Sequence, residues 1–264
     1  MIPYPLIDPE IIHIGPLAIR WYGVMYLIGF AASYFLVKEQ IKKRGLPLSS
    51  DFLESLFTCV ILGLVIGARL GYVLFYDLSA YLNHPLEIFA VWHGGMSFHG
   101  GLIGSVVCGV WYSKKSHADA WQIADLVIAT APIGLGMGRL GNFINGELYG
   151  RITDMPWGII FPNGGLLPRH PSQLYEFFLE GVVLFAILWI MKDRVRRSGV
   201  LLSLFIMLYG VIRFLVEFFR EPDSQLGFVL GHFTMGQILS TCMVLGGAVL
   251  FLARQREPTA RTGR

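Results

Sequence analysis

The chain has 264 residues, of which 54% are hydrophobic and only 15% are charged. The apolar residues come in long runs, whereas a soluble domain of this length spreads them through one core under a charged surface. The formal net charge of +3 reflects basic residues at the ends of the apolar runs, so it does not indicate nucleic-acid binding. These features exclude an ordinary soluble protein and predict a polytopic membrane protein.

The apolar runs have the length that a transmembrane helix needs. A hydrocarbon core of about 30 Å requires about 20 predominantly apolar residues in helical form. We therefore expect an all-α integral membrane protein with seven transmembrane helices in a single domain, residues 1–264, in which residues 138–174 form a signature loop and a small extracytoplasmic head. The seven runs are residues 18–37, 55–76, 94–112, 120–137, 175–191, 200–219 and 234–252.

Basic residues indicate how the chain crosses the membrane, because Lys and Arg near helix ends are retained on the cytoplasmic side. Fourteen of them follow the first, third, fifth and last runs. This distribution predicts an N-terminus outside, a C-terminus inside, and an outer position for the loop after the fourth run. The fourteen are Lys38, Lys42, Lys43, Arg44, Lys114, Lys115, Lys192, Arg194, Arg196, Arg197, Arg254, Arg256, Arg261 and Arg264.

The three cysteines, Cys59, Cys108 and Cys242, lie inside apolar runs. Their spacing suits neither a disulfide framework nor a metal site, and it is typical of small core residues. We therefore expect no bound metal.

Polar residues mark the outer ends of the first two runs. Arg20 and Tyr22 stand at the beginning of the first run, where Tyr is most often an interfacial anchor, so position alone favours anchoring over catalysis for Tyr22. In the second run, glycines at 63, 67 and 71 predict close approach of another helix. Placing the charged guanidinium of Arg69, in the same run, inside a membrane costs free energy. Either an ion pair with a carboxylate such as Asp125 or contact with a ligand would explain an arginine at this position.

Two histidines precede the third run within the sequence HGGMSFHGG, residues 93–101. Glycine pairs permit irregular backbone, which at membrane depth survives only inside protein or beside water. We therefore expect an irregular segment that enters the membrane from outside. His99 lies beside the glycines at the start of an apolar helix, and this position favours a structural role and a catalytic role equally.

A polar, glycine-rich stretch, residues 138–150, directly follows the fourth run and reads GRLGNFINGELYG. Its four glycines, two amides, one arginine and one glutamate at the end of a hydrophobic run indicate a binding site at membrane depth. The Pro- and Gly-rich loop that follows, with Trp157, Ile159 and Phe161 in alternation, predicts a small outer head with a short strand pair. Beyond it, Glu176 and Glu180 share a helical face and are candidates for holding arginines.

The end of the sixth run carries a polar stripe on one helical face. Tyr209, Arg213, Glu217 and Arg220 are spaced by three or four residues, so two arginines share one carboxylate. A structural ion-pair network is one explanation. Excess positive charge near Arg139 favours instead an anion, and the planar guanidinium fork matches phosphate oxygens. A phosphate at membrane depth indicates a phospholipid, and with a histidine that can accept a proton, this favours transfer of a lipid group on the outer face.

The 138–150 stretch matches the pattern G-R-x-[GA]-N-F-x-N-x-E-x-x-G and resembles the bacterial prolipoprotein diacylglyceryl transferases. Residues 20–23 (RWYG), 93–101, 170–173 (HPSQ) and 213–220 also look like that family, so the resemblance covers nearly the whole chain. It implies a multi-pass enzyme of the bacterial inner membrane with a periplasmic active site. Its partners would be phosphatidylglycerol and a preprolipoprotein with a lipobox cysteine, and the products a thioether and glycerol phosphate, with no cofactor.

The resemblance also implies roles for individual residues. His99 would be the base that deprotonates the thiol, although Tyr22 and substrate-borne water remain alternatives. Arg139 and Arg213 would bind the phosphate and stabilise charge on the leaving group. Asn142 and Asn145 would hydrogen-bond the headgroup, and Glu147 and Glu217 would orient arginines. The expected substrate-binding set is Arg139, Asn142, Asn145, Glu147, Gly150, Tyr209, Glu217 and Arg220, and the expected catalytic set is His99, Arg139, Arg213 and Tyr22.

Two other classes of function share some of these features. An anion transporter also has intramembrane arginines and broken helices, but the odd number of runs and the lack of an internal repeat disfavour it. A non-catalytic phospholipid-binding protein would have the same arginines without needing a histidine.

Overall fold

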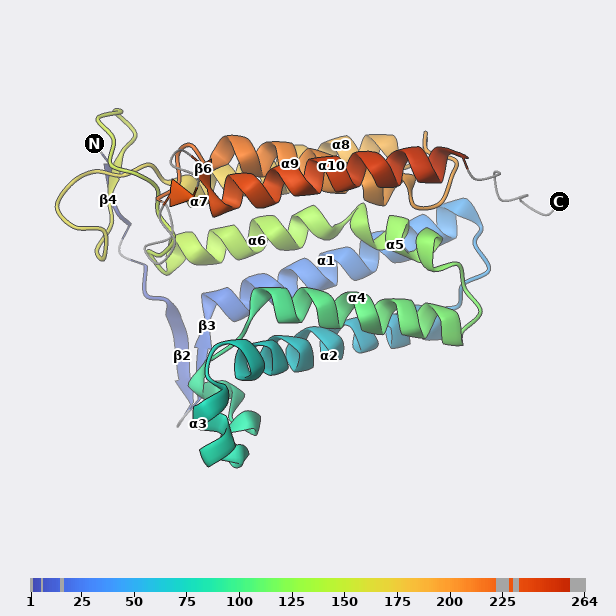
Figure 1. The fold of residues 1–264 in the computed structure, drawn as a ribbon, viewed down its shortest axis with the longest axis horizontal. Helices are drawn as coiled ribbons and strands as arrows, with labels where there is room; N and C mark the ends of the chain where they lie inside the picture. Colours follow the sequence, from blue (N-terminus) through green and yellow to red (C-terminus); the bar gives the residue numbers. More distant parts are fainter. Residues whose placement is uncertain (1, 6, 15–16, 222–227, 230–232, 257–264) are drawn as a thin grey trace. The chain divides into compact units, whose positions relative to one another are not determined.

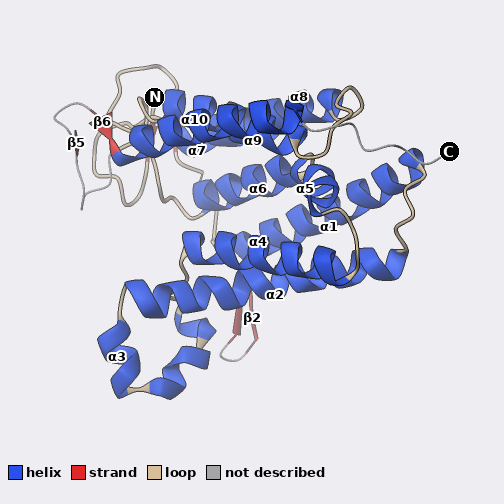
Figure 2. Cartoon of the chain, turned by 45° about the vertical axis from the view of Figure 1, so that its right-hand side comes forward, coloured by secondary structure: helices blue, strands red, loops and turns tan. Residues whose placement is uncertain are grey.

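The computed structural model describes residues 2–5, 7–14, 17–221, 228–229 and 233–256. The chain forms two compact units. Unit 1 comprises Met1–Val37 and Ala124–Arg264, and unit 2 comprises Lys38–Ile123. Both units are built mainly of helices (Figures 1 and 2).

Three helices in the described part of the chain are long and apolar enough to cross a membrane. They are α2 (Ser50–Phe75), α10 (Met235–Arg256) and the continuous stretch Ser172–Met191, which consists of α7 (Ser172–Glu176), the π-helical η3 (Phe177–Val183) and α8 (Leu184–Met191). The helical fold class and the membrane-spanning character are therefore confirmed, while the number of seven crossings stays a prediction.

The expected fourth span is a bent pair of helices. α5 (Ala120–Ile128) and α6 (Ala131–Ile144) qualify as one span only together, with a bend of 44° between them. Pro132 stands in the first turn of α6, where its missing N–H costs no helical hydrogen bond, so the proline is compatible with a restart of the helix. The apolar α9 (Val200–Val216) is shorter than the three clear spans.

Unit 2 is organised around the contact between α2 and α4 (Phe98–Lys115), which lie side by side (Figure 1). A Cβ on Gly67 would lie 2.4 Å from the Gly100 carbonyl oxygen, and one on Gly104 would lie 2.1 Å from the Gly63 carbonyl oxygen. No larger residue fits at these positions without a backbone shift. The predicted close approach at the glycines of the second run is confirmed.

The segment between α2 and α4 is held by Arg69. It contains α3 (Leu78–Asn83) and two 3-10 turns, η1 (Pro85–Phe89) and η2 (Val91–His93), and continues as irregular backbone up to α4, as expected. The Arg69 guanidinium is buried and donates to carbonyl groups of this segment, including Ile88 at 2.8 Å and Gly94 at 2.6 Å. The further acceptors are the carbonyls of Glu87, Ala90 and Gly95. Among the described residues Arg69 has backbone carbonyls and no carboxylate as acceptors, so the expected ion pair with Asp125 was wrong, while contact with a ligand stays a prediction.

In unit 1, α9 packs against α10 and α6 packs against η3. Gly136 and Gly181 make the second contact, because a Cβ on either would lie about 3 Å from the Cα of the other. The first helix, α1 (Trp21–Arg44), reaches α6 through a hydrogen bond of 2.6 Å between the Ser33 and Thr130 hydroxyls. A cluster of Ala129, Leu184, Leu188 and Leu201 forms the buried core beside these helices.

Short strands differ from the prediction at two places, the start of the first helix and the segment between α6 and α7. Leu17–Arg20 forms β3, which pairs antiparallel with β2 (Glu10–Ile14), so the first helix begins at Trp21 and not at residue 18. In the segment between α6 and α7, which was expected to form the outer head, β4 (Ile159–Ile160) pairs in parallel with β1 (Ile2–Pro3) from the N-terminus, a partner that the expected local strand pair did not include. The third short pair is β5 (Phe228–Val229) with β6 (Phe233–Thr234).

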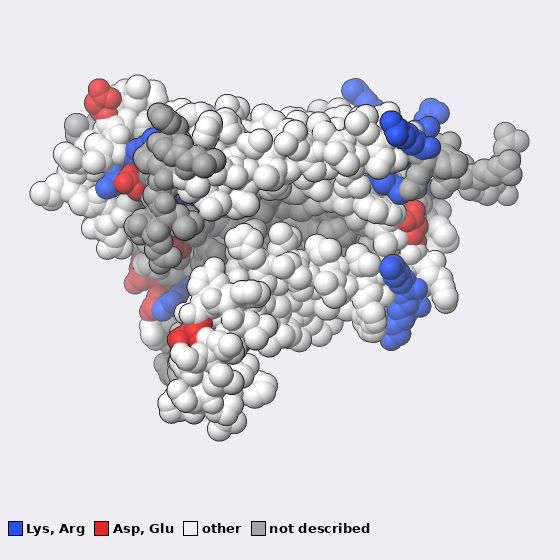
Figure 3. Space-filling view, viewed as in Figure 1, with Lys and Arg blue, Asp and Glu red and all other residues white. Residues whose placement is uncertain are grey.

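The helices present long surfaces without charge. Figure 3 shows that the middle of the helices carries no charged side chains on this face, whereas basic groups gather near helix ends. The last turns of α1, α4 and α10 contain basic residues from which the orientation was predicted, among them Lys115 and Arg254. Cys242 is exposed on α10, so the core interpretation is wrong for this cysteine, whereas Cys59 and Cys108 are partly buried.

Candidate active site

The first half of the 138–150 stretch is helical. Gly138 to Ile144 form the last two turns of α6, although a loop was expected there. The chain then turns at Gly146, whose φ of +66° favours glycine, and at Leu148, whose φ is +57°. Arg139 therefore projects from a helix packed against η3 and α7, and not from the expected loop.

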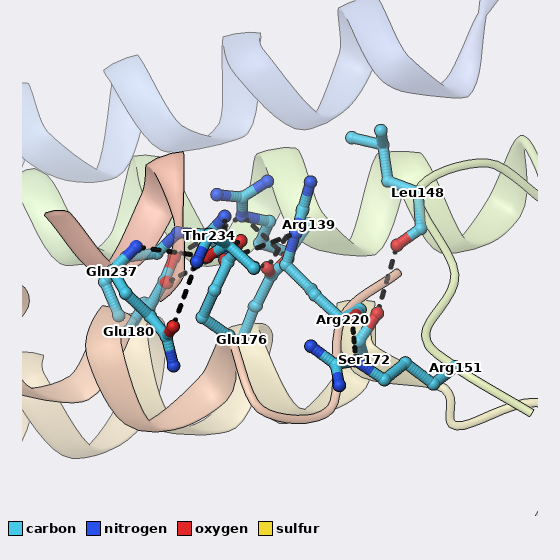
Figure 4. A network of polar contacts seen from close by, with 11 residues as sticks. Arg139, Leu148, Arg151, Ser172, Glu176, Glu180, Arg220, Thr234 and Gln237 are labelled. Atoms are coloured by element: carbon cyan, nitrogen blue, oxygen red, sulfur yellow. Dashed lines mark hydrogen bonds and ion pairs between the residues drawn. The ribbon is translucent and has the colours of Figure 1, made fainter. Parts of the chain in front are cut away.

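Arg139 belongs to a buried ion cluster that joins α6, α7, η3 and α9 (Figure 4). Its Nε lies 3.1 Å from Oε2 of Glu176 and 3.4 Å from Oε2 of Glu180. Arg213 contacts Oε1 of Glu176 at 2.5 Å and Oε2 of Glu217 at 2.8 Å. Arg220 reaches Glu176 at 3.1 Å, so Glu176 is shared by all three arginines. The expectation that Glu176 and Glu180 hold arginines is confirmed.

The cluster has no excess positive charge when every member is ionised. Its three arginines face three carboxylates, Glu176, Glu180 and Glu217, among the described residues. The expected charge surplus was wrong, because it counted the stripe on one helix and omitted the two glutamates that α7 and η3 supply. Glu176 and Glu180 have no exposed surface, and carboxylates this deeply buried require such partners.

The position of the Arg139 guanidinium is nevertheless suited to a further anion. Within the described chain, its closest approach to each of these two carboxylates is through Nε. Its terminal nitrogens, Nη1 and Nη2, donate no hydrogen bond to a carboxylate among the described residues, because the hydrogen bond to Glu180 comes from Nε. Because a guanidinium donates in a planar fork, an edge with Nη1 and Nη2 can receive phosphate or carboxylate oxygens.

A second polar group forms where the 138–150 stretch turns. Asn142 and Asn145 donate through their Nδ2 atoms to Oε1 of Glu147 at 2.9 and 3.1 Å, and Gln173 donates to the Glu147 carbonyl at 2.6 Å. Glu147 thus orients two amides, and no ion pair links it to an arginine among the described residues. The expected arginine-orienting role is wrong for Glu147, whereas Glu217 does pair with Arg213.

Gly150 is a packing position. Its N–H donates to the His170 carbonyl at 2.8 Å, and it forms an antiparallel bridge with Arg220. A Cβ there would lie 2.3 Å from the Phe219 carbonyl oxygen. The glycine therefore allows the end of the 138–150 stretch to pair with the chain that follows α9, next to the ion cluster.

Tyr22 stands against the signature helix. Its ring would lie 2.7 Å from a Cβ on Gly141, and its hydroxyl is 3.1 Å from that of Tyr26. It is thus adjacent to α6 within unit 1. His99 is the exposed second residue of α4 in unit 2. It lies two residues after the N-cap Ser97, whose hydroxyl accepts from Gly100 N–H. The structure groups Tyr22, Arg139, Asn142, Tyr209, Arg213, Glu217 and Arg220 in unit 1 and places His99 in unit 2.

Comparison with known proteins connects this arrangement to one family. A family model described as prolipoprotein diacylglyceryl transferase matches residues 9–253. The phosphatidylglycerol–prolipoprotein diacylglyceryl transferase of Desulfotalea psychrophila is 55% identical over 264 residues, which cover 98% of this chain and 97% of that protein. The chain belongs to the prolipoprotein diacylglyceryl transferase family.

Other relatives of the family match with similar coverage. The protein of the same name from Geobacter sulfurreducens is 55% identical over 258 residues, covering 97% of this chain and 99% of that protein. The one from Pseudomonas putida is 48% identical over 266 residues, covering 99% of both.

The sequence did not predict that three residues, Thr234, Gly236 and Gln237, would lie beside the ion cluster. Thr234 donates its hydroxyl to Oε1 of Glu217 at 3.0 Å, and Gly236 and Gln237 lie next to it at the start of α10. A signal was present, because Thr234 and Gln237 have the spacing of a helix capping box. The long separation from Glu217 in the sequence concealed the contact.

Proposed function

We propose that the chain transfers the diacylglyceryl group of phosphatidylglycerol to the lipobox cysteine thiol of a preprolipoprotein, the first step of bacterial lipoprotein maturation. Membership of the family and the names of its relatives support this activity. The observation that carries the proposal is the Arg139 guanidinium, which approaches two buried carboxylates most closely through Nε, while its terminal nitrogens donate no hydrogen bond to a carboxylate among the described residues.

At the glycerol carbon, the reaction forms one bond to sulfur and breaks one bond to oxygen. The cysteine sulfur attacks the glycerol carbon that carries the phosphate ester, so a C–S bond forms as the C–O bond breaks. Glycerol phosphate leaves with the bonding electron pair, and the thiol proton passes to a base. Atoms and charge balance without a cofactor, an oxidant or a covalent enzyme intermediate.

Arg139 and Arg213 would bind the lipid phosphate and stabilise the charge that grows on it. Charge-assisted hydrogen bonds contribute about 1.5 to 3 kcal/mol each, and preorganised donors act most strongly where water is excluded. The buried glutamates keep the guanidinium groups oriented before substrate binds, which reduces the reorganisation needed during the reaction. Asn142, Asn145 and Glu147 would contact the headgroup as one hydrogen-bonded unit.

His99 is the proposed base. A thiol has an unperturbed pKa of about 8.5 and becomes a good nucleophile only as the thiolate. An imidazole titrates near neutral pH and can accept the proton. The exposed position of His99 at the start of α4 is compatible with contact to a peptide substrate, and Tyr22 is the alternative acceptor.

The proposed topology has seven crossings, an outer N-terminus, an inner C-terminus and an active site on the periplasmic side of the bacterial inner membrane. The four candidate spans and the basic last turns of α1, α4 and α10 support it. The shorter α9 would complete its span with the residues that follow it, up to Phe219.

One assay tests the function. Purified protein in detergent, mixed with phosphatidylglycerol and a lipobox peptide, should release glycerol phosphate and yield a thioether-linked lipopeptide. Lipid binding without either product would favour a phospholipid-binding scaffold, and solute flux in liposomes would favour an anion transporter. In the same assay, His99→Ala should abolish most turnover. Turnover near that of the unmodified protein would exclude His99 as the base.

A further inference from the structure

The start of α10 contacts one oxygen of the Glu217 carboxylate, while the other oxygen pairs with Arg213. The Thr234 hydroxyl donates to Oε1 at 3.0 Å, and Nη2 of Arg213 lies 2.8 Å from Oε2. Glu217 and Thr234 are both buried, with 5% and 2% of their surfaces exposed. The carboxylate therefore connects a helix end that lies outside the expected site to an arginine inside it.

The direction of the Thr234 hydroxyl is fixed by a reciprocal cap. Gln237 N–H donates to Oγ1 of Thr234 at 3.2 Å, and Thr234 N–H donates to Oε1 of Gln237 at 3.1 Å (Figure 4). This is the capping-box geometry of a helix N-terminus. Because Oγ1 accepts from the backbone, its own proton is directed to Glu217. The end of the helix also favours a nearby negative charge.

Gly236 is required by space and not by backbone conformation. An added Cβ would lie 2.6 Å from both Cδ and Oε1 of Glu217 and 2.8 Å from Oε2. Real Cβ atoms essentially never approach a neighbour this closely, and Gly236 lies in ordinary helix after the first residue of α10. Any side chain at this position must push the Glu217 carboxylate away from its present place.

We propose that Thr234 and Gly236 are positioning residues of the transferase. Together they hold the Glu217 carboxylate where its second oxygen sets the orientation of the Arg213 guanidinium toward the lipid phosphate. This inference rests on the proposed function, in which Arg213 binds the lipid phosphate. Neither residue would contact substrate, because both act through Glu217.

Gly236→Ala tests the space requirement, with Gly246→Ala as the matched control in the same helix. Gly246 has nothing within 4 Å of an added Cβ, so its variant should keep the activity and the Tm of the unmodified protein. Because misplacement of a positioned group by about 1 Å can cost about 100-fold in rate, Gly236→Ala should lower kcat by about 10- to 100-fold. Unchanged kcat in Gly236→Ala would overturn the proposal.

A second change in Glu217 separates positioning from a folding defect. Asp is shorter than Glu by one methylene, about 1.5 Å, and withdraws the carboxylate from the added methyl group. Glu217→Asp alone should lower kcat, yet the double variant Gly236→Ala/Glu217→Asp should be at least about fivefold faster than Gly236→Ala, a coupling measured by the double-mutant cycle. A double variant slower than Gly236→Ala would contradict the proposal, because independent defects accumulate.

Substitutions of Thr234 test the proposal independently of Gly236. Thr234→Ser keeps the hydroxyl and should keep kcat, whereas Thr234→Val should lower it by about tenfold or more, the loss expected when an oriented charge-assisted bond of about 1.4 kcal/mol disappears. Thr241→Val, which removes a hydroxyl that donates within α10 to the Gln237 carbonyl, is the control. Equal kcat in Thr234→Ser and Thr234→Val would overturn this role. No product from the unmodified protein would instead reject the proposed function itself.

Discussion

Arg139 and Arg213 differ in the guanidinium nitrogens that they use for ion pairs. Arg213 uses Nη1 toward Glu176 and Nη2 toward Glu217, so both of its terminal nitrogens face carboxylates. Arg139 is held through Nε. At the scale of single residues, the terminal edge of Arg139, which donates no hydrogen bond to a carboxylate among the described residues, suits the proposed phosphate contact, while Arg213 would share its terminal nitrogens between its carboxylate partners and the phosphate.

This difference predicts the effect of replacing Arg139. A lysine keeps the charge but lacks the planar fork, so it cannot hold two carboxylates and a phosphate edge at once. We expect Arg139→Lys to lower kcat/KM for phosphatidylglycerol by at least about tenfold, and Arg139→Ala to lower it further. The measurement is release of glycerol phosphate. Arg20→Lys, on an exposed residue that pairs with Glu10, is the control and should be unchanged. Full activity of Arg139→Lys would contradict the proposed contact.

His170 lies two residues before α7, and its environment disfavours protonation. Burial lowers the pKa of its imidazole below the usual value of about 6.5, and its Nδ1 lies 3.1 Å from the Tyr175 hydroxyl. The unfolded chain therefore binds a proton here at a higher pH than the folded chain does. The stabilising contribution of the neutral ring is complete above the unfolded pKa and is lost as pH falls through the folded pKa.

The pH dependence of thermal unfolding tests this imidazole. We expect the Tm of the purified protein to fall as pH decreases below about 6.5, because protonation then favours the unfolded state. His170→Gln should make this part of the pH profile flatter. His84→Gln, which alters an exposed histidine with no ion pair among the described residues, is the control. An identical slope in His170→Gln would assign the pH dependence to other groups.

At the scale of elements, the glycine spacing predicted a helix contact correctly, whereas the apolar run placed the start of the first helix wrongly. The glycine spacing in the second run predicted the approach of α4 to α2, because small residues at a four-residue spacing share one helix face. The start of the first helix was placed too early, because residues 17–20 are apolar enough to resemble a span. They pair instead with β2, and pairing between segments is decided by hydrogen bonds that apolar composition does not reveal.

Arg69 shows why an element can depend on a single charged residue. Its guanidinium satisfies carbonyls of the segment that leads to His99, where regular structure provides no partner for them. Each hydrogen bond to a charged group contributes about 1.5 to 3 kcal/mol. Arg69 therefore stabilises the irregular segment that the glycine pairs allow.

We expect Arg69→Met to lower the free energy of unfolding by at least about 3 kcal/mol, because several buried carbonyls lose their donor. Thermal unfolding in detergent measures the loss. Arg20→Met removes only an exposed ion pair and should cost about 1 kcal/mol or less. If the two variants had the same Tm, the segment would not depend on Arg69.

At the scale of the whole molecule, the proposed topology can be tested with reporters on each side of the membrane. Fluorescent-protein fusions after Lys115 and after Arg256 should fluoresce, because both follow basic helix ends expected in the cytoplasm. Alkaline phosphatase inserted after Asn163, in the outer head, should be active because it folds only outside. Active phosphatase at Lys115 would reverse the orientation.

The sequence by itself determined the membrane class, the approximate helices, the family signature and the residues that could form a phosphate site. These properties depend on local composition and spacing, which the hydrocarbon thickness and the helical period translate directly into structure. Only the tertiary structure decided the charge of the cluster and the role of the α10 terminus. Glu176, Glu180 and Thr234 are distant from Arg139 and Glu217 in the chain, and which buried charges neutralise one another depends on packing between helices that no single helix encodes.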